Sequence, residues 1–548
     1  MEYYDGDPLR HMGDLPAMAA HRYGDRTALT AFGQTQSFTE LDDEANRVAN
    51  VLLDHGVEPD DRVGLFVPNS LQFPSAYFGA MRAGAVPVPL NLRMDPETLV
   101  FVLGDSEVEH LIGSPLLADE TKNLAAAAEV GTTFLAGVSG EGIVNYSHAL
   151  EEASGELDDR PERAYDDVAC QPYTSGTTGR PKGVLLTHEN LLSTIESYSK
   201  TPLRIDPDES ILLVLPLFHI YALNALLGTF LYKGGSMVLQ PRPEPEPMLE
   251  AIEAHELTSF AGVPAMYTMM QREYASDPDA YDLSSLEEVT CAAAPLAEAT
   301  RREIEDAWDV PMAGGWGMTE TSPAGTFLPA RGANKEAGCV GIPVPGVELK
   351  LVDPETRETR LSADELEPRP DPEIDYEDPE RVTGEIAIRG PNVFVGYHNR
   401  PEKTEQVFDE EGWFYTEDIQ RVDSDGYFWM VERADDMMIV GGENVYPSEV
   451  EDALYDHPDV AEAAVVAADH EVKGQAPVAF VVADESTDLG EEELREFTLD
   501  HVASYAHPRR VFFVDELPRS ATQKVQRFKL EDDAAGRLDG PLTSGERL

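Results

Sequence analysis

Apolar residues recur at helical spacing in residues 38–57, near the start of the chain. Their positions are Leu41, Ala45, Val48, Ala49 and Leu52. Gly56 follows as a helix stop signal. A strand-like apolar run at 61–69, a helical stretch at 73–85 and a second strand-like run at 86–91 come next. This order predicts alternating helices and strands, which is typical of a doubly wound α/β sheet.

The same rhythm returns at 211–239 and again at 247–263. Residues 353–380 differ, because they carry many acids and prolines and few apolar residues. They predict a solvated surface loop or insertion. From residue 384 onward, short strands and turns predict a small β-rich subdomain.

After Asp435 the pattern changes to short helix and strand units over about 110 residues, which predicts a separate α+β domain. We therefore predict an α/β protein with two domains. Residues 1–433 form a large N-terminal domain of doubly wound αβ subdomains plus the β-rich subdomain. Residues 434–548 form a smaller, mobile α+β domain whose last segment frays.

Acidic residues far outnumber basic ones. The 548 residues include 103 Asp and Glu and 41 Lys and Arg, a formal net charge of −62. This balance disfavours nucleic acid and anionic lipid as partners, since both need clustered positive charge. The acids are spread along the whole chain, so self-repulsion is strong unless salt screens it. We interpret the surface as halophile-type; an acidic mesophilic enzyme is the alternative.

The sequence shows no sign of export or of a membrane span. The N-terminus lacks a basic segment followed by an apolar one, and the longest apolar run, 211–218, is far shorter than the ~20 residues of a membrane helix. Cys170, Cys291 and Cys339 lie far apart, which indicates neither a zinc site nor a disulfide framework. We expect a cytoplasmic protein without integral membrane association.

The segment YTSGTTGRPKGV at 173–184 is the sharpest chemical signal. It combines three glycines, four Ser or Thr residues and Lys182, directly after a predicted strand. Glycines let backbone N–H groups converge on an anion, and the hydroxyls and the ammonium add donors. It is not a Walker loop, because GxxxxGK[ST] is absent and Pro181 precedes the lysine. The pattern predicts a phosphate-binding loop.

This loop resembles that of the adenylate-forming superfamily of acyl-CoA synthetases, luciferases and peptide-synthetase adenylation domains. Five further strings resemble family motifs in the family's order, and the resemblance spans roughly residues 10–530. The six strings are YTSGTTGRPKGV (173–184), WGMTET (316–321), GEIAIRG (384–390), WFYTED (413–418), RADDMMIVGGENVYPSEVE (433–451) and PRSATQK (518–524).

The resemblance implies ATP, Mg²⁺ and CoA as reactants and cofactor, and it assigns roles to single residues. The residues implied to wrap the β- and γ-phosphates are Thr174, Ser175, Gly176, Thr177, Thr178, Gly179 and Lys182. Thr319 is implied to touch the α-phosphate and Glu320 to hold Mg²⁺. Lys524 is implied to reach the acyl carboxylate and the α-phosphate during adenylation.

Further roles follow from the same resemblance. Trp316 matches an aromatic residue that packs on adenine, beside Ala294 and Pro295. Asp418 and Arg433 match two ribose contacts. Asp435 matches the family's interdomain hinge residue. Gly442 matches the glycine that lines the family's pantetheine tunnel.

Three residues depart from the family pattern by replacing a glycine: Glu417, Glu432 and Gln523. A glycine at such a position often permits positive φ, so Gln523 must accept strain or alter its loop. These changes leave open a second reading, a nucleotide-binding homologue with weakened catalysis. A luciferase-like oxygenase shares the motifs and is a third.

The string LPLFHIYALNALLG at 215–228 resembles the segment that borders the acyl pocket in fatty acyl-CoA synthetases and 4-coumarate–CoA ligases. The implied pocket residues are His219, Tyr221, Asn224, Val263, Gly315 and Pro323. They are mostly apolar, and His219 is also a catalytic candidate. A medium- or long-chain fatty acid is our first expectation for the substrate and an aryl or arylpropenoic acid the second.

The expected partners are therefore a small-molecule carboxylic acid, ATP and CoA. No phosphopantetheine-carrier domain follows Lys524, so CoA is the economical acceptor, although a free-standing carrier protein stays open. The sequence leaves the oligomeric state open, with a homodimer as one candidate.

The charge predicts a salt requirement. The melting temperature should rise as KCl is raised from low concentration to about 1 M, because screening weakens repulsion within a chain of charge −62. Thermal unfolding across a KCl series measures this. A melting temperature that stays flat or falls would contradict the halophile-type interpretation.

Overall fold

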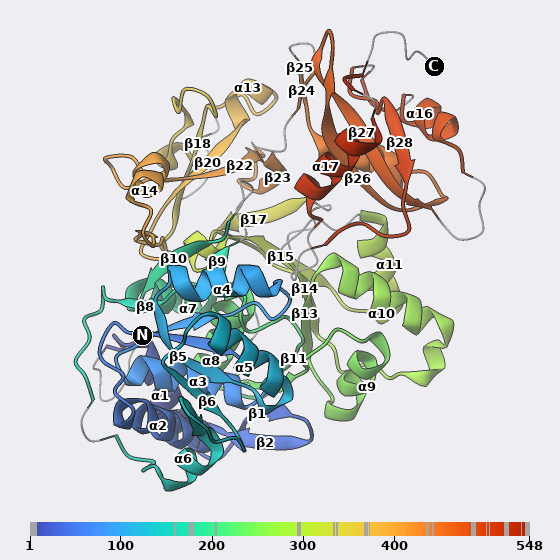
Figure 1. The fold of residues 1–548 in the computed structure, drawn as a ribbon. Coiled ribbons are helices and arrows are strands. Elements are labelled where there is room, and N and C mark those ends of the chain that lie inside the picture. Colours follow the sequence, from blue (N-terminus) through green and yellow to red (C-terminus); the bar gives the residue numbers. More distant parts are fainter. Residues whose placement is uncertain are drawn as a thin grey trace.

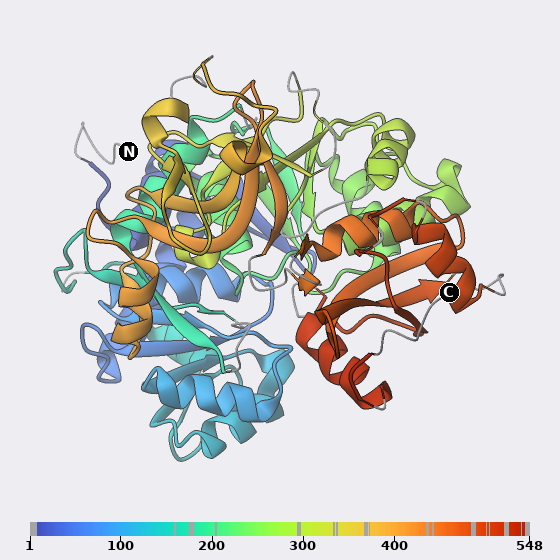
Figure 2. The same ribbon diagram turned by 90° about the horizontal axis from the view of Figure 1, so that it is seen from above.

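The structure is a computed structural model. It describes residues 8–157, 160–174, 180–202, 205–292, 298–331, 335, 338–366, 371, 373–433, 438–440, 443–483, 489–499, 501–503, 505–519, 525–538 and 540–542. Over these ranges it shows the predicted mixed α/β fold, with a large N-terminal part and a smaller C-terminal part gathered to one side in both views (Figure 1, Figure 2).

A five-stranded, wholly parallel sheet occupies the first part of the chain. Its order is β4 (Val86–Pro89), β3 (Arg62–Phe66), β5 (Val108–Gly113), β6 (Thr132–Leu135) and β7 (Ile143–Asn145). Both apolar runs at 61–69 and 86–91 are strands, as predicted. Helices follow the strands in alternation, which confirms the doubly wound pattern here.

A second, longer sheet begins as a parallel sheet. Its first strands, in spatial order, are β2 (Gln34–Ser37), β1 (Thr27–Ala31), β12 (Ser236–Leu239), β11 (Ser210–Leu213), β13 (Ser259–Gly262), β14 (Glu288–Cys291) and β15 (Met312–Trp316). Every pair except β1 with β2 is parallel. The carboxyl ends of these strands, where ligands bind in open α/β sheets, therefore share one edge.

The same sheet continues as an antiparallel one. The further strands are β16 (Thr326–Leu328), β17 (Cys339–Pro343), β23 (Phe428–Arg433), β22 (Phe414–Val422), β20 (Thr383–Arg389), β18 (Glu348–Val352) and β19 (Thr359–Leu361). The β-rich region expected from residue 384 is thus hydrogen-bonded edge to edge with the parallel strands. The changeover lies within β15, which pairs parallel with β14 and antiparallel with β16.

A small sheet stands apart from these two. It is built on β10 (Lys182–Thr187), which pairs antiparallel with β21 (Gly396–Tyr397), β8 (Val168–Cys170) and β9 (Tyr173–Thr174). This sheet joins a strand from the middle of the chain to one more than 200 residues later. It holds both ends of the predicted phosphate loop.

The C-terminal part has its own sheet. Its strands are β25 (Glu443–Val445), β24 (Met438–Val440), β27 (Gly474–Ala483), β26 (Val460–His470) and β28 (Arg510–Phe513). Helices α15 (Pro447–Tyr455), α16 (Glu491–Leu499) and α17 (Arg527–Arg537) accompany it. Among the described residues, every cluster of buried apolar side chains lies wholly on one side of residue 433. This packing is consistent with two domains, and the boundary at 433/434 stays a prediction.

Helix α2 (Phe38–Asp54) matches the first helix expected from the sequence. All five predicted apolar positions are buried, and Ser37 begins the helix with a capping box to Glu40. Among the described residues, the other α-helices of six or more residues in the N-terminal part are α1 (Leu15–Tyr23), α3 (Gln72–Arg82), α4 (Pro96–Asp105), α5 (Ala118–Ala127), α6 (Tyr146–Glu152), α7 (His188–Ser199), α9 (Pro245–His255), α10 (Pro264–Ser276), α11 (Glu298–Trp308) and α14 (Pro401–Val407). Within the described ranges, no helix combines the length and apolar character needed to cross a membrane.

Residues 353–380 are more structured than the predicted loop. They contain β19 and the short helix α12 (Ala363–Leu366), and α13 (Pro379–Val382) follows at their end. Leu361 is fully buried and Leu366 nearly so. Arg360 bonds Asp353 at 2.6 Å. A few apolar anchors and ion pairs hold this acidic segment to the sheet, and composition alone does not reveal them.

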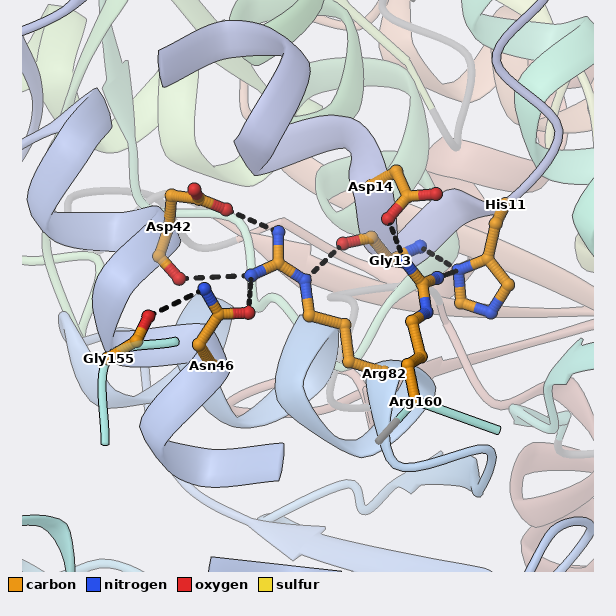
Figure 3. Close-up of polar contacts among 8 residues, drawn as sticks. All are labelled: His11, Gly13, Asp14, Asp42, Asn46, Arg82, Gly155 and Arg160. Atoms are coloured by element: carbon orange, nitrogen blue, oxygen red, sulfur yellow. Dashed lines mark hydrogen bonds and ion pairs between the residues drawn. The ribbon is translucent and has the colours of Figure 1, made fainter. Parts of the chain in front are cut away.

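A buried arginine ties the start of the chain to two helices (Figure 3). Arg82, at the end of α3, is 2% exposed. Its Nε donates to the Gly13 carbonyl at 2.7 Å. Its Nη1 donates to Asn46 Oδ1 at 2.7 Å, and its guanidinium also pairs with Asp42 on α2. A planar guanidinium suits this task, because its fixed donors reach three acceptors at once.

A pair of buried histidines lies next to this arginine. The rings of His11 and His188 are 4.0 Å apart between centroids, and His188 Nδ1 accepts from the Met12 N–H at 3.0 Å. Arg160 contacts His11 and Asp14 (Figure 3). Burial, together with the nearby Arg163 and Arg160, lowers the pKa of His188 to about 3, and burial also lowers the pKa of His11 well below its usual value.

The lowered pKa predicts acid sensitivity. The unfolded chain binds a proton at each histidine below about pH 6.5 and the folded chain does not, so stability is full above that pH. It is lost as pH falls, by up to about 1.4 kcal/mol per pH unit for each histidine. Urea unfolding from about pH 7.5 to about pH 5 at constant high ionic strength measures the slope.

The matched variant is His188→Asn. It offers an oxygen to the Met12 N–H and removes the titrating group. We expect a shallower loss of unfolding free energy with falling pH than in the parent. Equal slopes for the two proteins would contradict a neutral, buried His188.

Candidate active site

The predicted phosphate loop connects two paired strands. Thr174 on β9 lies opposite Lys182 on β10, and Tyr173 lies opposite Gly183. A Cβ on Gly183 would lie 2.8 Å from Gln171 Nε2 and 3.0 Å from the Tyr173 ring, so only glycine fits there without a shift. The hairpin therefore fixes where the loop begins and ends, with Thr174 and Lys182 side by side and half-buried.

Lys182 lies next to Glu320 through a shared tyrosine. The Lys182 ammonium sits 4.8 Å from the centroid of the Tyr397 ring. The Tyr397 hydroxyl donates to Glu320 Oε1 at 2.9 Å. Burial raises the pKa of Tyr397, and the Glu320 carboxylate raises it further, so the phenol is a hydrogen-bond donor at neutral pH. The predicted phosphate and Mg²⁺ residues thus come together around one aromatic ring.

Backbone contacts hold the Thr319–Thr321 turn in place. The Phe394 N–H donates to the Glu320 carbonyl at 2.8 Å. The buried amide of Asn392 donates to the carbonyls of Thr321 at 2.9 Å and Ala324 at 2.6 Å. Glu320 is itself buried, and Thr319 is half-buried. The segment after β20 therefore anchors this turn, which carries two of the predicted catalytic residues, Thr319 and Glu320.

Trp316 and Asp418, the predicted adenine and ribose residues, contact each other directly. The Trp316 indole N–H donates to Asp418 Oδ2 at 2.7 Å, and both side chains are buried. Trp316 ends β15, directly after Gly315. A Cβ on Gly325 would lie 2.4 Å from the Trp316 ring, so that glycine leaves room for the indole. The two roles implied by separate motifs fall on one hydrogen-bonded pair.

The two predicted ribose residues also lie opposite each other on paired strands. Asp418 on β22 lies opposite Arg433 on β23. Next to Asp418, Glu417 has φ of +62°, the left-handed conformation that a glycine adopts freely. Its N–H donates to Glu385 Oε1 at 2.9 Å. The departure from the family's glycine therefore places a side chain in a strained backbone region, at a point where the pairing of β22 with β20 shifts register between Glu385 and Ala387.

Glu385 adds to the negative charge beside Asp418. Burial raises the pKa of Glu385, and the neighbouring Glu417 and Asp418 carboxylates raise it as well, whereas the Glu417 N–H and Arg357 lower it. Lys403 balances part of this charge through an ion pair with Glu417 at 3.5 Å. A hydroxyl-bearing sugar suits such a cluster better than a phosphate does, because hydroxyls can donate to carboxylates.

His219 stands before a π-helix, η3 (Tyr221–Gly228). It is half-buried, and its Nδ1 accepts from the Tyr221 N–H at 3.3 Å. Burial raises the pKa of Tyr221, and Tyr198 and Cys291 raise it further. Asn224 is buried and donates to the Leu191 carbonyl at 3.1 Å and to the Ser322 carbonyl at 2.6 Å. Asn224 thus links the π-helix to the turn that carries Glu320.

Several predicted site residues lie outside the described residues. They are Ser175, Gly176, Thr177, Thr178, Gly179, Ala294, Pro295, Asp435, Gly442 and Lys524. Their roles stay predictions. The described members are Thr174 on β9, Lys182 on β10, His219 before η3, Gly315 and Trp316 on β15, Thr319 and Glu320 on the turn after β15, Asp418 on β22 and Arg433 on β23.

The residues present fit a magnesium ion that arrives with phosphates. Among the described residues, no group of three or more His, Cys, Asp and Glu side chains could hold a metal ion alone. Magnesium is usually bound by one or two carboxylates together with substrate phosphates and water. The single buried carboxylate of Glu320, oriented by a tyrosine hydroxyl, matches that donor set.

Sequence reasoning missed Tyr397 and Asn392. Both lie in the segment after GEIAIRG, where Gly396 has φ of +146° and a Cβ there would lie 2.9 Å from Thr404. The glycine before an aromatic residue was a usable signal of a constrained backbone. The hydrogen bonds of these two side chains to the Glu320 turn join residues 68 to 77 positions apart, which local patterns do not encode.

Comparison with known proteins gives consistent matches. The family model described as AMP-binding enzyme matches residues 17–398, and its C-terminal domain model matches residues 449–524. Feruloyl-CoA synthase of Amycolatopsis sp is 35% identical over 94% of this chain and 97% of its own length. The long-chain-fatty-acid–CoA ligase of Bacillus subtilis (strain 168) is 29% identical over 96% of this chain and 95% of its own.

A solved structure agrees with these matches. The crystal structure of the anthranilate CoA ligase AuaEII in complex with anthranoyl-AMP superposes with a TM-score of 0.85 at 27% identity, covering 98% of this chain and 100% of its own. The likeness extends through both parts of the chain. It confirms the predicted architecture of a large N-terminal and a smaller C-terminal part.

The positive φ of Glu417 predicts that glycine is more stable than alanine at this position, the reverse of the usual order in a strand. Glu417→Gly should be more stable than Glu417→Ala by about 1 kcal/mol, because alanine at positive φ is strained. Both variants lose the same side chain, so the comparison isolates the backbone. Urea unfolding of the two proteins measures the difference.

Arg421, exposed on the same strand, supplies the matched control. At this position the alanine variant should be more stable than the glycine variant by about 0.5–1 kcal/mol, the ordinary order in a strand. If alanine is also the more stable replacement at 417, the left-handed conformation there is wrong.

Proposed function

The chain belongs to the AMP-binding enzyme family, and on that premise we propose that it is a CoA ligase acting on an aryl or arylpropenoic acid. In the first step, an acid carboxylate attacks the α-phosphorus of ATP, forming acyl-AMP and releasing pyrophosphate. In the second, the CoA thiol attacks the acyl carbon, giving the thioester, AMP and a proton. Acyl-CoA ligases of this family use ATP and CoA.

The arrangement of Lys182, Tyr397 and Glu320 carries the proposal. The first step joins two anions, so it needs positive charge and alignment more than acid–base chemistry. Lys182 offers an ammonium at the end of a glycine-rich hairpin. Glu320 offers a carboxylate fixed by the Tyr397 hydroxyl at 2.9 Å. A site with one ammonium that can bind phosphate and one carboxylate that can bind a phosphate-bound cation suits ATP.

Other roles complete the proposed reaction. Thr319 would contact the α-phosphate, and the Trp316–Asp418 pair would face the nucleoside. Magnesium, when bound at Glu320, would neutralise phosphate charge. Lys524 would supply a second cation during adenylation. Asp435 would act as the pivot that moves the C-terminal domain for the second step, with Gly442 then lining the path of CoA.

Identity to feruloyl-CoA synthase supports an aryl or arylpropenoic acid. That relative is 35% identical over 94% of this chain, and AuaEII, the solved structure, is an anthranilate CoA ligase. In this chain, Tyr221, one of the predicted pocket residues, begins the apolar π-helix η3. Aromatic and apolar side chains suit a planar ring.

A medium- or long-chain fatty acid is the second candidate. The Bacillus subtilis relative is a long-chain-fatty-acid–CoA ligase, 29% identical over 96% of this chain. The buried faces of η3 are apolar apart from Asn224, which suits an alkyl tail as well. The two candidates differ in the acid alone and share every proposed nucleotide contact.

A panel of acids tests the proposal. Purified protein in high KCl receives ATP, Mg²⁺ and CoA with ferulic, 4-coumaric and benzoic acids and with C8, C12 and C16 fatty acids, and both pyrophosphate release and thioester are measured. We expect kcat/KM to be at least about 10-fold higher for the arylpropenoic acids, the size that apolar-pocket discrimination reaches. A preference for fatty acids would overturn the aryl assignment. Absence of turnover with every acid would favour the catalytically weakened homologue.

A further inference from the structure

Tyr397 touches two charged residues from different elements of the site. Its ring faces the Lys182 ammonium on β10, with 4.8 Å from Nζ to the ring centroid. Its hydroxyl donates to Glu320 Oε1 at 2.9 Å, on the turn after β15. The phenol and the carboxylate are both buried, at 7% and 5% exposed. One side chain therefore sets where an ammonium and a carboxylate lie relative to each other.

The surroundings of Tyr397 keep its ring in one place. Its strand β21 pairs with β10, with Tyr397 opposite Val184. Its N–H donates to Thr404 Oγ1 at 2.9 Å, and Thr404 is anchored in turn to the Arg400 carbonyl at 3.1 Å. The Phe394 ring packs edge-on at 4.9 Å between centroids. A side chain fixed by backbone, hydroxyl and aromatic contacts can orient others.

Each of the two contacts has a separate chemical effect. A neutral hydroxyl bonded to a buried carboxylate is a charge-assisted hydrogen bond, which orients the carboxylate and leaves its charge in place. A ring face attracts an ammonium without neutralising it. Tyr397 thus holds both charges without supplying a charge of its own. In a direct Lys–Glu ion pair, by contrast, the two charges would neutralise each other.

Resting on the proposed function, we propose that Tyr397 is a positioning residue for acyl-adenylate formation: its hydroxyl orients Glu320 toward a phosphate-bound cation, and its ring holds the Lys182 ammonium toward the phosphates. Removing the hydroxyl should affect the use of Mg²⁺. Removing the ring should also affect ATP itself. These two effects separate a positioning role from a loss of packing.

The chain offers a matched control in Tyr415. Its hydroxyl donates to Asp409 Oδ2 at 2.9 Å, and its ring lies under the Arg357 guanidinium at 4.1 Å and near Lys350 at 5.6 Å. Tyr415 is 5% exposed, similar to Tyr397. Tyr415→Phe therefore removes the same kind of hydroxyl–carboxylate bond from a residue outside the proposed site.

The experiment compares Tyr397→Phe, Tyr397→Leu and Tyr415→Phe with the parent protein. It measures acid-dependent pyrophosphate release across a Mg²⁺ series, and the equilibrium binding of a fluorescent ATP analogue with and without Mg²⁺. For Tyr397→Phe we expect kcat/KM for ATP to fall about 10- to 100-fold, the usual cost of losing a group that orients a metal ligand. The Mg²⁺ concentration needed for half-maximal rate should rise. The dissociation constant of the analogue without Mg²⁺ should stay within about 2-fold of the parent's, because the aromatic ring at position 397 remains.

Tyr397→Leu should also weaken binding of the analogue without Mg²⁺, because the ring under Lys182 is gone. Tyr415→Phe should match the parent in every nucleotide measurement. The proposal is overturned if Tyr397→Phe behaves like Tyr415→Phe. Should Tyr397→Leu fail to fold, Tyr397→Phe decides alone.

The design also separates this proposal from the proposed function. If none of the tested acids causes the parent to release pyrophosphate, the proposed function is wrong, while the binding of the ATP analogue still tests the role of Tyr397. If the parent is active and Tyr397→Phe is unaffected in both measurements, the role of Tyr397 is wrong and the function stands.

Discussion

A carboxylate and a triphosphate repel each other, and the protein that would join them carries a formal net charge of −62. Positive charge must therefore be concentrated where the reaction takes place. Lys182 is suited to that requirement, because its ammonium faces an uncharged ring, 4.8 Å from the Tyr397 centroid, in a chain rich in competing carboxylates. The proposed site depends on this contact, since a lysine neutralised by a nearby acid would offer little net positive charge to a phosphate.

The fold brings these residues together from distant parts of the chain. The small sheet places Lys182 on β10 beside Tyr397 on β21. The long sheet changes from parallel to antiparallel at β15. Trp316 is the last residue of that strand, and the Thr319–Thr321 turn follows directly after it. The antiparallel half then brings Asp418 within hydrogen-bonding distance of the Trp316 indole N–H. Strands of two sheets and the turn after β15 therefore supply the predicted nucleotide contacts.

The sequence predicted the features that depend on local patterns. The five apolar positions of α2 are all buried, because helical periodicity depends on neighbours within one turn or two. The glycine replaced by Glu417 indeed marks a positive φ, which the local backbone requires. Residue types alone predict a phosphate loop between Thr174 and Lys182; the structure shows the strand pairing at its two ends, and anion binding there stays a prediction.

Features that depend on long-range contacts were not predicted. Tyr397 and Glu320 are far apart in sequence, and no local pattern indicates that a hydroxyl meets a carboxylate. The acidic segment 353–380 has short elements because Leu361 and Leu366 find buried places in the fold. The direct bond between Trp316 and Asp418 likewise follows from strand pairing rather than from either motif.

The central claim is that this site forms an acyl-adenylate before any thiol takes part. ATP–pyrophosphate exchange, with labelled pyrophosphate in the absence of CoA, measures that step alone. The account predicts exchange that requires a carboxylic acid and proceeds without CoA, because the first step releases pyrophosphate reversibly. Thioester formation from an acid that supports no exchange would contradict it.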